Sequence, residues 1–294
     1  MLGINNLNLL LEELDNYTDT NTEATIELNP EHLEDKDNRH KFISLLKKHK
    51  VNRVSVGVQT INEKIKKLIA RNYCLEKLAT LYKELRVEGF NISFDFMFAL
   101  PDQTISSLQK DLNFIEKCSP HHVSIYLFTP PENYPLISLL PDEGMVERMF
   151  DIVHKKMTKL GYDHYEISNY AIPGKESIHN LAYWDRTSYI GLGAAAHSFL
   201  KQEHLRYWHS RDVQGYLSDP LTVTSEKLTK DMEYTETIML GLRTFTSGVT
   251  EQTFKGDKYR SLLNDGLLER RNGRILVPFK HIPILDSIIK ELTC

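Results

Sequence analysis

Between residues 24 and 168, two patterns of hydrophobic and polar positions alternate along the chain. Short runs rich in Val, Ile and Phe are separated by longer stretches in which apolar residues recur every three or four positions. The first pattern predicts buried strands and the second predicts amphipathic helices. Strands are expected at residues 24–28, 53–58, 91–98, 122–128 and 163–168, and helices at 40–48, 62–70, 75–88, 106–118 and 143–160. This alternation is typical of βα units that build a largely parallel sheet.

The pattern changes after about residue 198. A polar, turn-rich stretch runs to Asp219-Pro220, and a helical period follows at residues 231–242. Farther on, the apolar segments 266–270 and 274–277 flank Asn272-Gly273, which predicts a tight β-hairpin. A helix followed by a hairpin indicates a small winged-helix-like module. We therefore expect a sheet-bearing domain at residues 1–200, a connecting segment at 201–224 and a winged-helix-like domain at 225–294.

Composition and charge exclude several classes of protein. Of the 294 residues, 41% are hydrophobic and 26% are charged, which is typical of a globular protein with a sizeable core. Residues 225–294 contain 11 Lys and Arg against 10 Asp and Glu, too even a balance for a surface that binds phosphates. We therefore expect no nucleic-acid partner. The sequence has no basic signal segment and no apolar run that could span a membrane, so the expected compartment is the cytoplasm.

Three cysteines, Cys74, Cys118 and Cys294, lie far apart in the sequence. None belongs to a C-x-x-C pair or to another close ligand spacing. This arrangement predicts neither a disulfide framework nor a self-contained zinc or iron-sulfur site.

Four polar residues lie at or near the ends of the expected strands. Glu27 could accept hydrogen bonds from a ribose diol, and the Gln59 amide could both donate to a ligand and accept from it. Arg71 could hold a carboxylate by two parallel bonds. Asp95 interrupts an apolar strand, where a carboxylate is costly unless it is paired or functional. Because the carboxyl ends of parallel strands meet at one edge, a shared site is predicted, although each residue alone could be an ordinary solvated or paired group.

The segment from His179 to Trp184 reads His-Asn-Leu-Ala-Tyr-Trp. Imidazole is a common axial ligand of haem iron, and Tyr and Trp present large flat faces with polar tips. Taken alone, these residues could equally be ordinary capping and core positions.

Several motifs occur together in a fixed order. They are Ile26-Glu27-Leu28-Asn29-Pro30, residues 52–59, Asp95 followed by Leu100-Pro101-Asp102-Gln103-Thr104, residues 165–171, Gly191-Leu192-Gly193 and Ala196-His197-Ser198. From about residue 20 to the C-terminus the chain resembles the radical S-adenosylmethionine (SAM) proteins related to oxygen-independent coproporphyrinogen III oxidase. The H-N-x-x-Y-W pattern from His179 resembles the haem motif of the HemW branch, which contains haem chaperones.

The resemblance implies an incomplete radical SAM (βα) barrel. It implies that Glu27, Gln59, Arg71 and Asp95 bind SAM, and that His179, Asn180, Tyr183 and Trp184 bind haem. His179 would be the ligand of the haem iron, with a purely structural role as the alternative. The implied function is to bind haem and pass it to a haem-accepting apoprotein, which could itself associate peripherally with a membrane.

The chain departs from this family in one defining element. The family holds a 4Fe-4S cluster with C-x-x-x-C-x-x-C, which this sequence lacks together with the glycine-rich segment that touches SAM. We therefore expect no catalytic residue for SAM cleavage and the absence of about two barrel strands. A misplaced start codon, a decayed gene and a shortened functional protein are the competing explanations. In addition, Ala99 and Ala194-Ala195 replace a usual glycine and a usual Pro-Gly.

Two other functions remain as alternatives. One is oxidative decarboxylation of coproporphyrinogen III in porphyrin biosynthesis, which the haem motif disfavours. The other is a non-catalytic remnant or a protein that binds nucleic acid through its tail.

Overall fold

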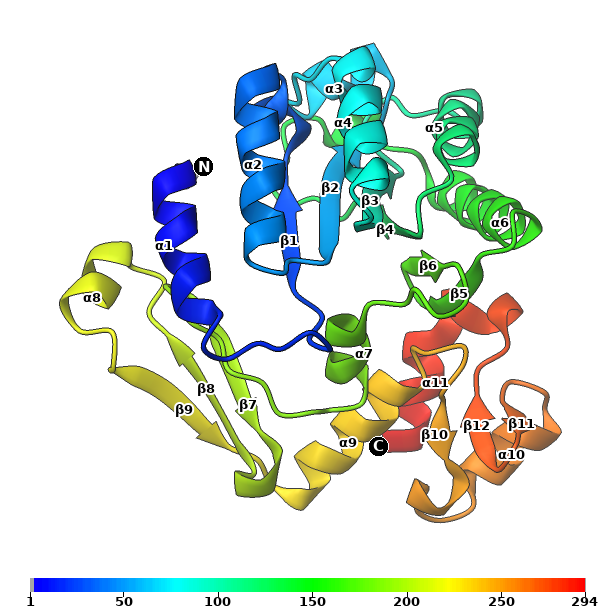
Figure 1. Cartoon of the computed structure of the whole chain (residues 1–294). Coiled ribbons are helices and arrows are strands. Elements are labelled where there is room, and N and C mark those ends of the chain that lie inside the picture. The colour runs from blue at the N-terminus through cyan, green and yellow to red at the C-terminus, as the bar shows by residue number, and fades with distance from the viewer. Residues whose placement is uncertain (1–2, 294) are drawn as a thin grey trace. The chain divides into compact units, whose positions relative to one another are not determined.

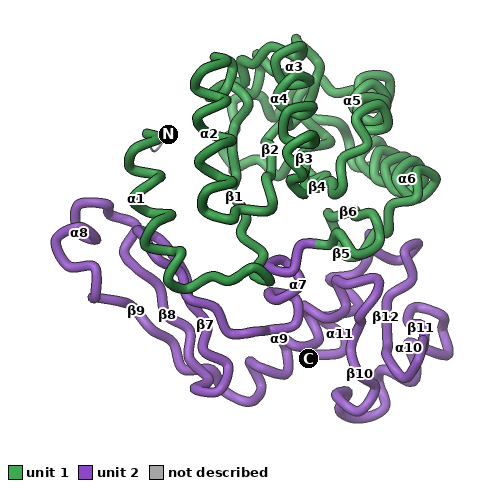
Figure 2. Tube along the Cα trace, in the orientation of Figure 1, with its two compact units in different colours: residues 1–176 green, residues 177–294 purple. Residues whose placement is uncertain are grey.

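The chain divides between Glu176 and Ser177 into two units, coloured green and purple in Figure 2. This computed structural model describes residues 3–293. The three-part division at residues 200 and 224 that the sequence suggested stays a prediction.

A six-stranded sheet forms the centre of the first unit, in the order β1-β2-β3-β4-β6-β5. The strands are β1 Thr25–Leu28, β2 Arg53–Gln59, β3 Asn91–Phe98, β4 His122–Leu127, β5 Asp163–Glu166 and β6 Asn169–Ala171. The first four run parallel, and β6 runs antiparallel to both β4 and β5. Within residues 3–293 this sheet stays open, because β1 and β5 each have one neighbour. The expected α/β fold with an incomplete barrel is confirmed.

Helices of the first unit cover one face of the sheet (Figure 1). They are α2 Lys36–Lys48, α4 Leu75–Val87, α5 Ile105–Cys118 and α6 Glu143–Lys159, while the short α3 Glu63–Leu68 follows β2. Val54, Phe94 and Val123 are fully buried beneath them. Helix α2 begins before the expected residue 40, because the Asp35 side chain accepts a hydrogen bond from the Asn38 amide and caps the helix.

The other face of the sheet is polar. Successive side chains of a strand point to opposite faces, so the buried Val and Phe positions alternate with polar ones. In the register, Glu27 lies beside Ser55, and Asp95 lies between Gly57 and Ser124. Neighbours in register share a face, so these residues of β1, β2, β3 and β4 form one polar surface.

The prediction of a single strand at residues 163–168 was wrong in detail. Residues 167 and 168 form a turn, and the chain reverses to pair Asp163 with Ala171. The Glu166 carboxylate accepts a hydrogen bond from the Ser168 amide (3.3 Å) at this turn. A two-residue periodicity does not distinguish one strand from two short strands joined by a tight turn.

The second unit contains two small antiparallel sheets. The first has the order β7-β8-β9 and the second β10-β12-β11. Its elements are α7 Ile178–Trp184, β7 His197–Leu200, β8 Leu205–His209, α8 Val213–Ser218, β9 Val223–Lys227, α9 Lys230–Gly241, β10 Val249–Thr250, α10 Lys258–Asn264, β11 Glu269–Arg271, β12 Arg274–Leu276 and α11 Leu285–Thr293. Residues 197–227, which read as a polar stretch, therefore include a three-stranded sheet whose edge strand β9 is largely exposed.

The predicted hairpin is confirmed at β11 and β12. Asn272 and Gly273 both have positive φ, at 52° and 74°. A two-residue turn with two positive φ values matches the twist of the strands, and Asn-Gly adopts it readily.

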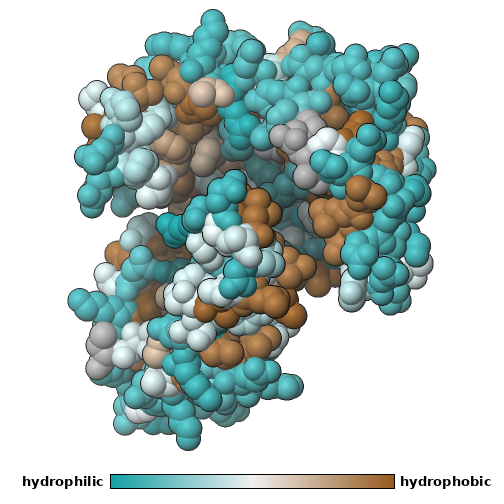
Figure 3. Space-filling view, turned by 90° about the vertical axis from the view of Figure 1, so that its left-hand side faces the viewer, coloured by the Kyte–Doolittle hydropathy of each residue, from teal (hydrophilic) through white to brown (hydrophobic). Residues whose placement is uncertain are grey.

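Helix α1, Ile4–Leu14, contributes one buried side chain, Leu7. Leu9 and Leu10 are exposed on the same helix. Figure 3, which views the molecule from the side of α1 in Figure 1, shows apolar side chains gathered in patches among hydrophilic ones. Among the described residues, no helix has the length and apolar character to cross a membrane.

Candidate functional site

The polar surface of the first unit centres on Asp95 of β3. The Ser55 hydroxyl donates to the Asp95 carboxylate, at 3.0 and 2.8 Å from its two oxygens. Burial raises the pKa of Asp95, hydrogen bonds from Ser55 and Ser124 oppose this shift, and the charge of Glu27 adds to it. Glu27 itself is exposed on the edge strand β1. The two carboxylates therefore lie near one another and present acceptors to any ligand with hydroxyl groups.

Gln59 ends β2 in a strained turn. Its φ is 67°, and the Thr60 amide donates to the Val58 carbonyl (2.9 Å) across it. A γ-turn with positive φ at its centre is rare and costs a non-glycine residue free energy. The pairing of β2 with β3 also shifts register between Gly57 and Gln59. Strain of this kind persists only where surrounding contacts hold it.

Two amides lie against the Gly57 backbone. A Cβ built on Gly57 would meet Asn29 Oδ1 at 3.0 Å and Gln59 Nε2 at 3.2 Å. Arg71 joins this group, because its Nη1 donates to Asn29 Oδ1 (2.6 Å) and lies 3.7 Å from Glu31 Oε1. Glycine is needed at this position because a larger residue would push both amides out of place.

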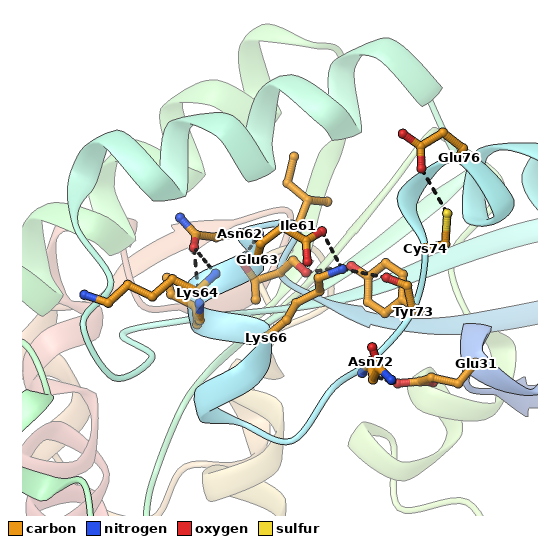
Figure 4. Close-up of polar contacts among 12 residues, drawn as sticks. Glu31, Ile61, Asn62, Glu63, Lys64, Lys66, Asn72, Tyr73, Cys74 and Glu76 are labelled. Carbon is orange, nitrogen blue, oxygen red and sulfur yellow. Dashed lines mark hydrogen bonds and ion pairs between the residues drawn. The ribbon is translucent and has the colours of Figure 1, made fainter.

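Buried contacts fix the loop that carries Arg71 (Figure 4). The Lys66 ammonium, on a side chain that is 2% exposed, donates to the Tyr73 carbonyl (2.6 Å) and pairs with Glu63 (2.8 Å). The Tyr73 hydroxyl donates in turn to the Thr60 carbonyl (2.6 Å). The loop between α3 and α4 is thus tied to the turn that follows β2.

The four residues that the sequence singled out in this unit therefore gather on one surface. Glu27 and Asp95 interact through their charges. Gln59 and Asn29 both lie against Gly57, and Arg71 bonds to Asn29. Sequence reasoning did not select Asn29 or Ser55. Asn29 directly follows β1, and its place after a strand end was the one signal that could have indicated it.

The second predicted motif forms the short helix α7. Ser177 caps this helix, and its hydroxyl accepts from the Asn180 amide (3.3 Å). His179 and Tyr183, four residues apart, lie on one side of the helix, and their rings meet edge to face with centroids 4.7 Å apart. Both side chains are exposed, whereas Trp184 is half-buried.

The aromatic contacts continue beyond the helix. The rings of Tyr183 and Tyr189 also meet edge to face, with centroids 4.6 Å apart. Tyr189 forms a β-bridge with Phe199 of β7. The surface that begins at His179 thus extends as a row of rings, next to the exposed Ile190.

Arg186 anchors the segment that leaves α7. Its guanidinium lies 3.3 Å from Glu233 and 3.2 Å from Glu236, both on α9, and 5.2 Å from the centre of the Phe199 ring. The Arg186 side chain is 9% exposed. Its partners are about 50 residues away in sequence, so no local signal indicated this role.

Two residues that differ from the usual family residue lie at positions with positive φ. Ala99 and Ala195 have φ values of 59° and 63°. Both stand where the sequence resemblance expects glycine, which adopts this conformation without a steric penalty. The structure thus gives a conformational reason for glycine at these sites.

Among residues 3–293, no three His, Cys, Asp or Glu side chains gather as metal ligands. Cys74 donates to the Glu76 carboxylate (2.9 Å), and burial raises the pKa of the Cys118 thiol to about 11. A cluster needs thiolates at close spacing, so these residues do not fit a 4Fe-4S cluster. The amides, guanidinium and carboxylates around Gly57, in contrast, fit the amino-acid and ribose groups of SAM.

Comparisons with known proteins agree with this architecture. A family model described as the radical SAM superfamily matches residues 4–115. The chain is 32% identical to the heme chaperone HemW of Lactococcus lactis, over 97% of this chain and 78% of that protein. It is 34% identical to the heme chaperone HemW of Bacillus subtilis, over 84% of this chain and 66% of that protein. The chain thus spans just under two thirds of the second relative.

A solved structure shares the fold. Coproporphyrinogen III oxidase (HemN) from Escherichia coli, described as a radical SAM enzyme, matches with a TM-score of 0.81. The match covers 99% of this chain and 75% of that chain at 18% identity. At this identity the likeness establishes the fold alone.

Proposed function

We propose that this chain, which belongs to the HemW family of haem chaperones within the radical SAM superfamily, binds haem at α7 and passes it to an apoprotein acceptor. The observation that carries the proposal is the exposed side of α7, where His179 stands against the Tyr183 ring. An imidazole that reaches the surface can ligate iron, and the neighbouring Tyr183 ring offers a flat apolar face to a porphyrin.

An open surface also suits transfer. A ligand enclosed in a cavity has most of its surface buried and leaves slowly, whereas a ligand on an exposed helix keeps one face accessible to an acceptor. The Tyr183 ring supports one face of a porphyrin in this way, and the Tyr189 ring packs against Tyr183 edge to face. Asn180 and Trp184 then act mainly through the helix: the first at its capped start, the second by packing at its end.

A hemin titration followed by the Soret band tests haem binding. His179→Ala is expected to weaken hemin binding at least tenfold, a loss of about 1.4 kcal/mol or more. His40→Ala is the matched control, because His40 is also an exposed histidine on a helix but belongs to the first unit. Equal hemin affinity in the His179→Ala variant and the wild type would overturn the proposal.

Transfer is measured by mixing the hemin-loaded chain with apomyoglobin. We expect holomyoglobin to form at a rate that depends on apomyoglobin concentration, as direct hand-over requires. A rate that is independent of acceptor and equal to the spontaneous release of hemin would refute chaperone transfer while leaving haem binding intact.

We also infer that the polar surface around Gly57 binds an adenosyl ligand such as SAM. Arg71 is suited to the ligand carboxylate, and Glu27 and Asp95 are suited to its ribose hydroxyls. When bound to a cluster, SAM supplies a radical in this superfamily, and the residues described here bind and orient it without such chemistry. Calorimetric titration with S-adenosylhomocysteine tests the site: Asp95→Asn should weaken binding, whereas Asp151→Asn, on the exposed side of α6, should not.

A further inference from the structure

Asp111 of α5 is a buried carboxyl group that no motif singled out. It is 1% exposed. Its oxygens accept hydrogen bonds from the Thr60 hydroxyl (3.1 and 3.0 Å), the Ile61 amide (2.7 Å) and the Gln103 side-chain amide (3.3 Å). A buried carboxylate with this many donors is held firmly and holds its partners equally firmly.

The first two partners directly follow Gln59. Thr60 and Ile61 are the first two residues after the strained position, and Thr60 is fully buried. The positive φ of Gln59 needs such a restraint, because a free turn would relax to a commoner conformation. Asp111 therefore fixes the direction in which the Gln59 amide leaves the strand.

Thr60 is also bonded to the loop that carries Arg71. The Thr60 carbonyl accepts from the Tyr73 hydroxyl, and the Tyr73 carbonyl accepts from Lys66. Arg71 lies two residues before Tyr73 in this loop. We call Asp111, Thr60 and Tyr73 the buried clamp. The clamp holds the two segments that carry Gln59 and Arg71.

We propose that Asp111 is a positioning residue: through the buried clamp it sets Gln59 and Arg71, so that protonation of its carboxyl group weakens binding of an adenosyl ligand at the surface. This inference rests on the proposed adenosyl site, in that it names how the site is regulated. Asp111 touches no ligand and acts through Thr60 and Ile61.

The sign follows from the hydrogen bonds. The Ile61 amide can only donate, and the Leu100 amide donates to Gln103 Oε1 (3.2 Å), which keeps the Gln103 amino group as a donor toward Asp111. An ionised carboxylate accepts from all three of its donors, whereas a protonated one brings an additional donor among them. The ionised form therefore holds the turn better, and ligand affinity should fall as the pH falls.

The surroundings of Asp111 bring the protonation of its carboxyl group close to neutral pH. Burial raises its pKa to about 7, against the hydrogen bonds from Ile61, Thr60 and Gln103. The groups that face it are the Tyr73 phenol, whose pKa burial raises further, and beyond it the ion pair of Lys66 with Glu63. On the turn before α5, Asp102 is already paired with Lys64.

Amide resonances of the deuterated, ¹⁵N-labelled full chain test the clamp without any ligand. In wild type, the Ile61 resonance is expected to titrate with a midpoint at about pH 7, because its amide bonds directly to the carboxylate. Asp111→Asn should abolish this titration and move the resonances of Gln59 and Arg71. Asp151→Asn should do neither. Unchanged Gln59 and Arg71 resonances in Asp111→Asn would overturn the proposal.

Titration with S-adenosylhomocysteine, which carries the carboxylate that Arg71 is suited to hold, tests the consequence. Wild-type affinity should fall on going from about pH 8 to about pH 6, and Asp111→Asn should bind about tenfold more weakly at the higher pH with little pH dependence. Equal affinities and equal pH profiles would refute the coupling. If wild type binds no adenosyl ligand at either pH, the proposed adenosyl site fails, while the resonances still decide whether the clamp positions Gln59.

A second variant tests the same contact in case Asp111→Asn does not fold. Thr60→Val keeps the shape of the side chain and the Asp111 carboxyl group but breaks the bond between them. If the proposal holds, its Gln59 resonance moves and its ligand affinity falls, as in Asp111→Asn. An unchanged Gln59 resonance and affinity in Thr60→Val would overturn it.

Discussion

Replacing Gln59 with glycine is expected to stabilise the first unit while removing an amide from the proposed binding surface. Gln59 has a φ of 67°, and this conformation costs a residue with a Cβ about 1–2 kcal/mol. Glycine adopts it without that cost but loses about 0.5–1 kcal/mol more backbone entropy on folding. The net gain for Gln59→Gly is therefore at most about 1.5 kcal/mol, with a central value of about 0.75 kcal/mol. For a unit of this size the central value should raise the melting temperature by about 1.5–3 °C.

Gln59→Ala is the matched control, because it removes the same amide and keeps the strained φ. Thermal unfolding followed by far-ultraviolet circular dichroism measures both variants. Trp184 and Trp208, which both belong to the second unit, report that unit separately by fluorescence. If Gln59→Gly proves no more stable than Gln59→Ala, the turn is not strained and the reasoning fails. Both variants should bind S-adenosylhomocysteine equally weakly.

Three further outcomes follow from buried groups. Burial lowers the pKa of His164 to about 3, so its contribution to stability is present above the ordinary histidine pKa of about 6.5 and is lost as the pH falls toward 3. In His164→Phe, the free energy of unfolding should depend less on pH in this window, and an identical pH dependence would contradict the assignment. Arg186→Met removes the cation that Glu233 and Glu236 share, although Glu236 keeps Arg206 and Glu233 keeps His204 as partners, and should cost about 1–2 kcal/mol in urea unfolding monitored by tryptophan fluorescence. An effect below about 0.5 kcal/mol would place Arg186 among ordinary surface ion pairs. The Cys118 thiol, whose pKa burial raises to about 11, should resist iodoacetamide at about pH 8 until the chain unfolds, as mass spectrometry can detect.

The sequence predicted the elements that have strong local patterns. Strands β2 and β3 are apolar runs buried on one face, and the Asn272-Gly273 turn has its own chemistry. In contrast, the sheet of β7, β8 and β9 was missed because its strands are only partly buried and their polar residues resemble a loop. Periodicity finds strands that bury a face, and these strands bury little.

The candidate site shows the same limit. Gln59 stood out because it ends a strand of a parallel sheet, and Asp95 stood out because a carboxylate interrupts an apolar strand. Asp111 did not stand out, because its contact with Thr60 joins residues 51 positions apart. The strained φ of Gln59 was equally invisible, since it arises from a tertiary restraint and not from a turn-forming residue. The ligand roles assigned to these side chains stay predictions.

Chemical rescue tests most directly whether His179 ligates haem. His179→Gly is loaded with hemin, and the Soret and resonance Raman spectra are recorded before and after imidazole is added. We expect the variant to lose the histidine-ligated spectrum of the wild type and free imidazole to restore it, because the ring can occupy the space left on the exposed side of α7. A variant that keeps the wild-type spectrum without imidazole would contradict the central claim.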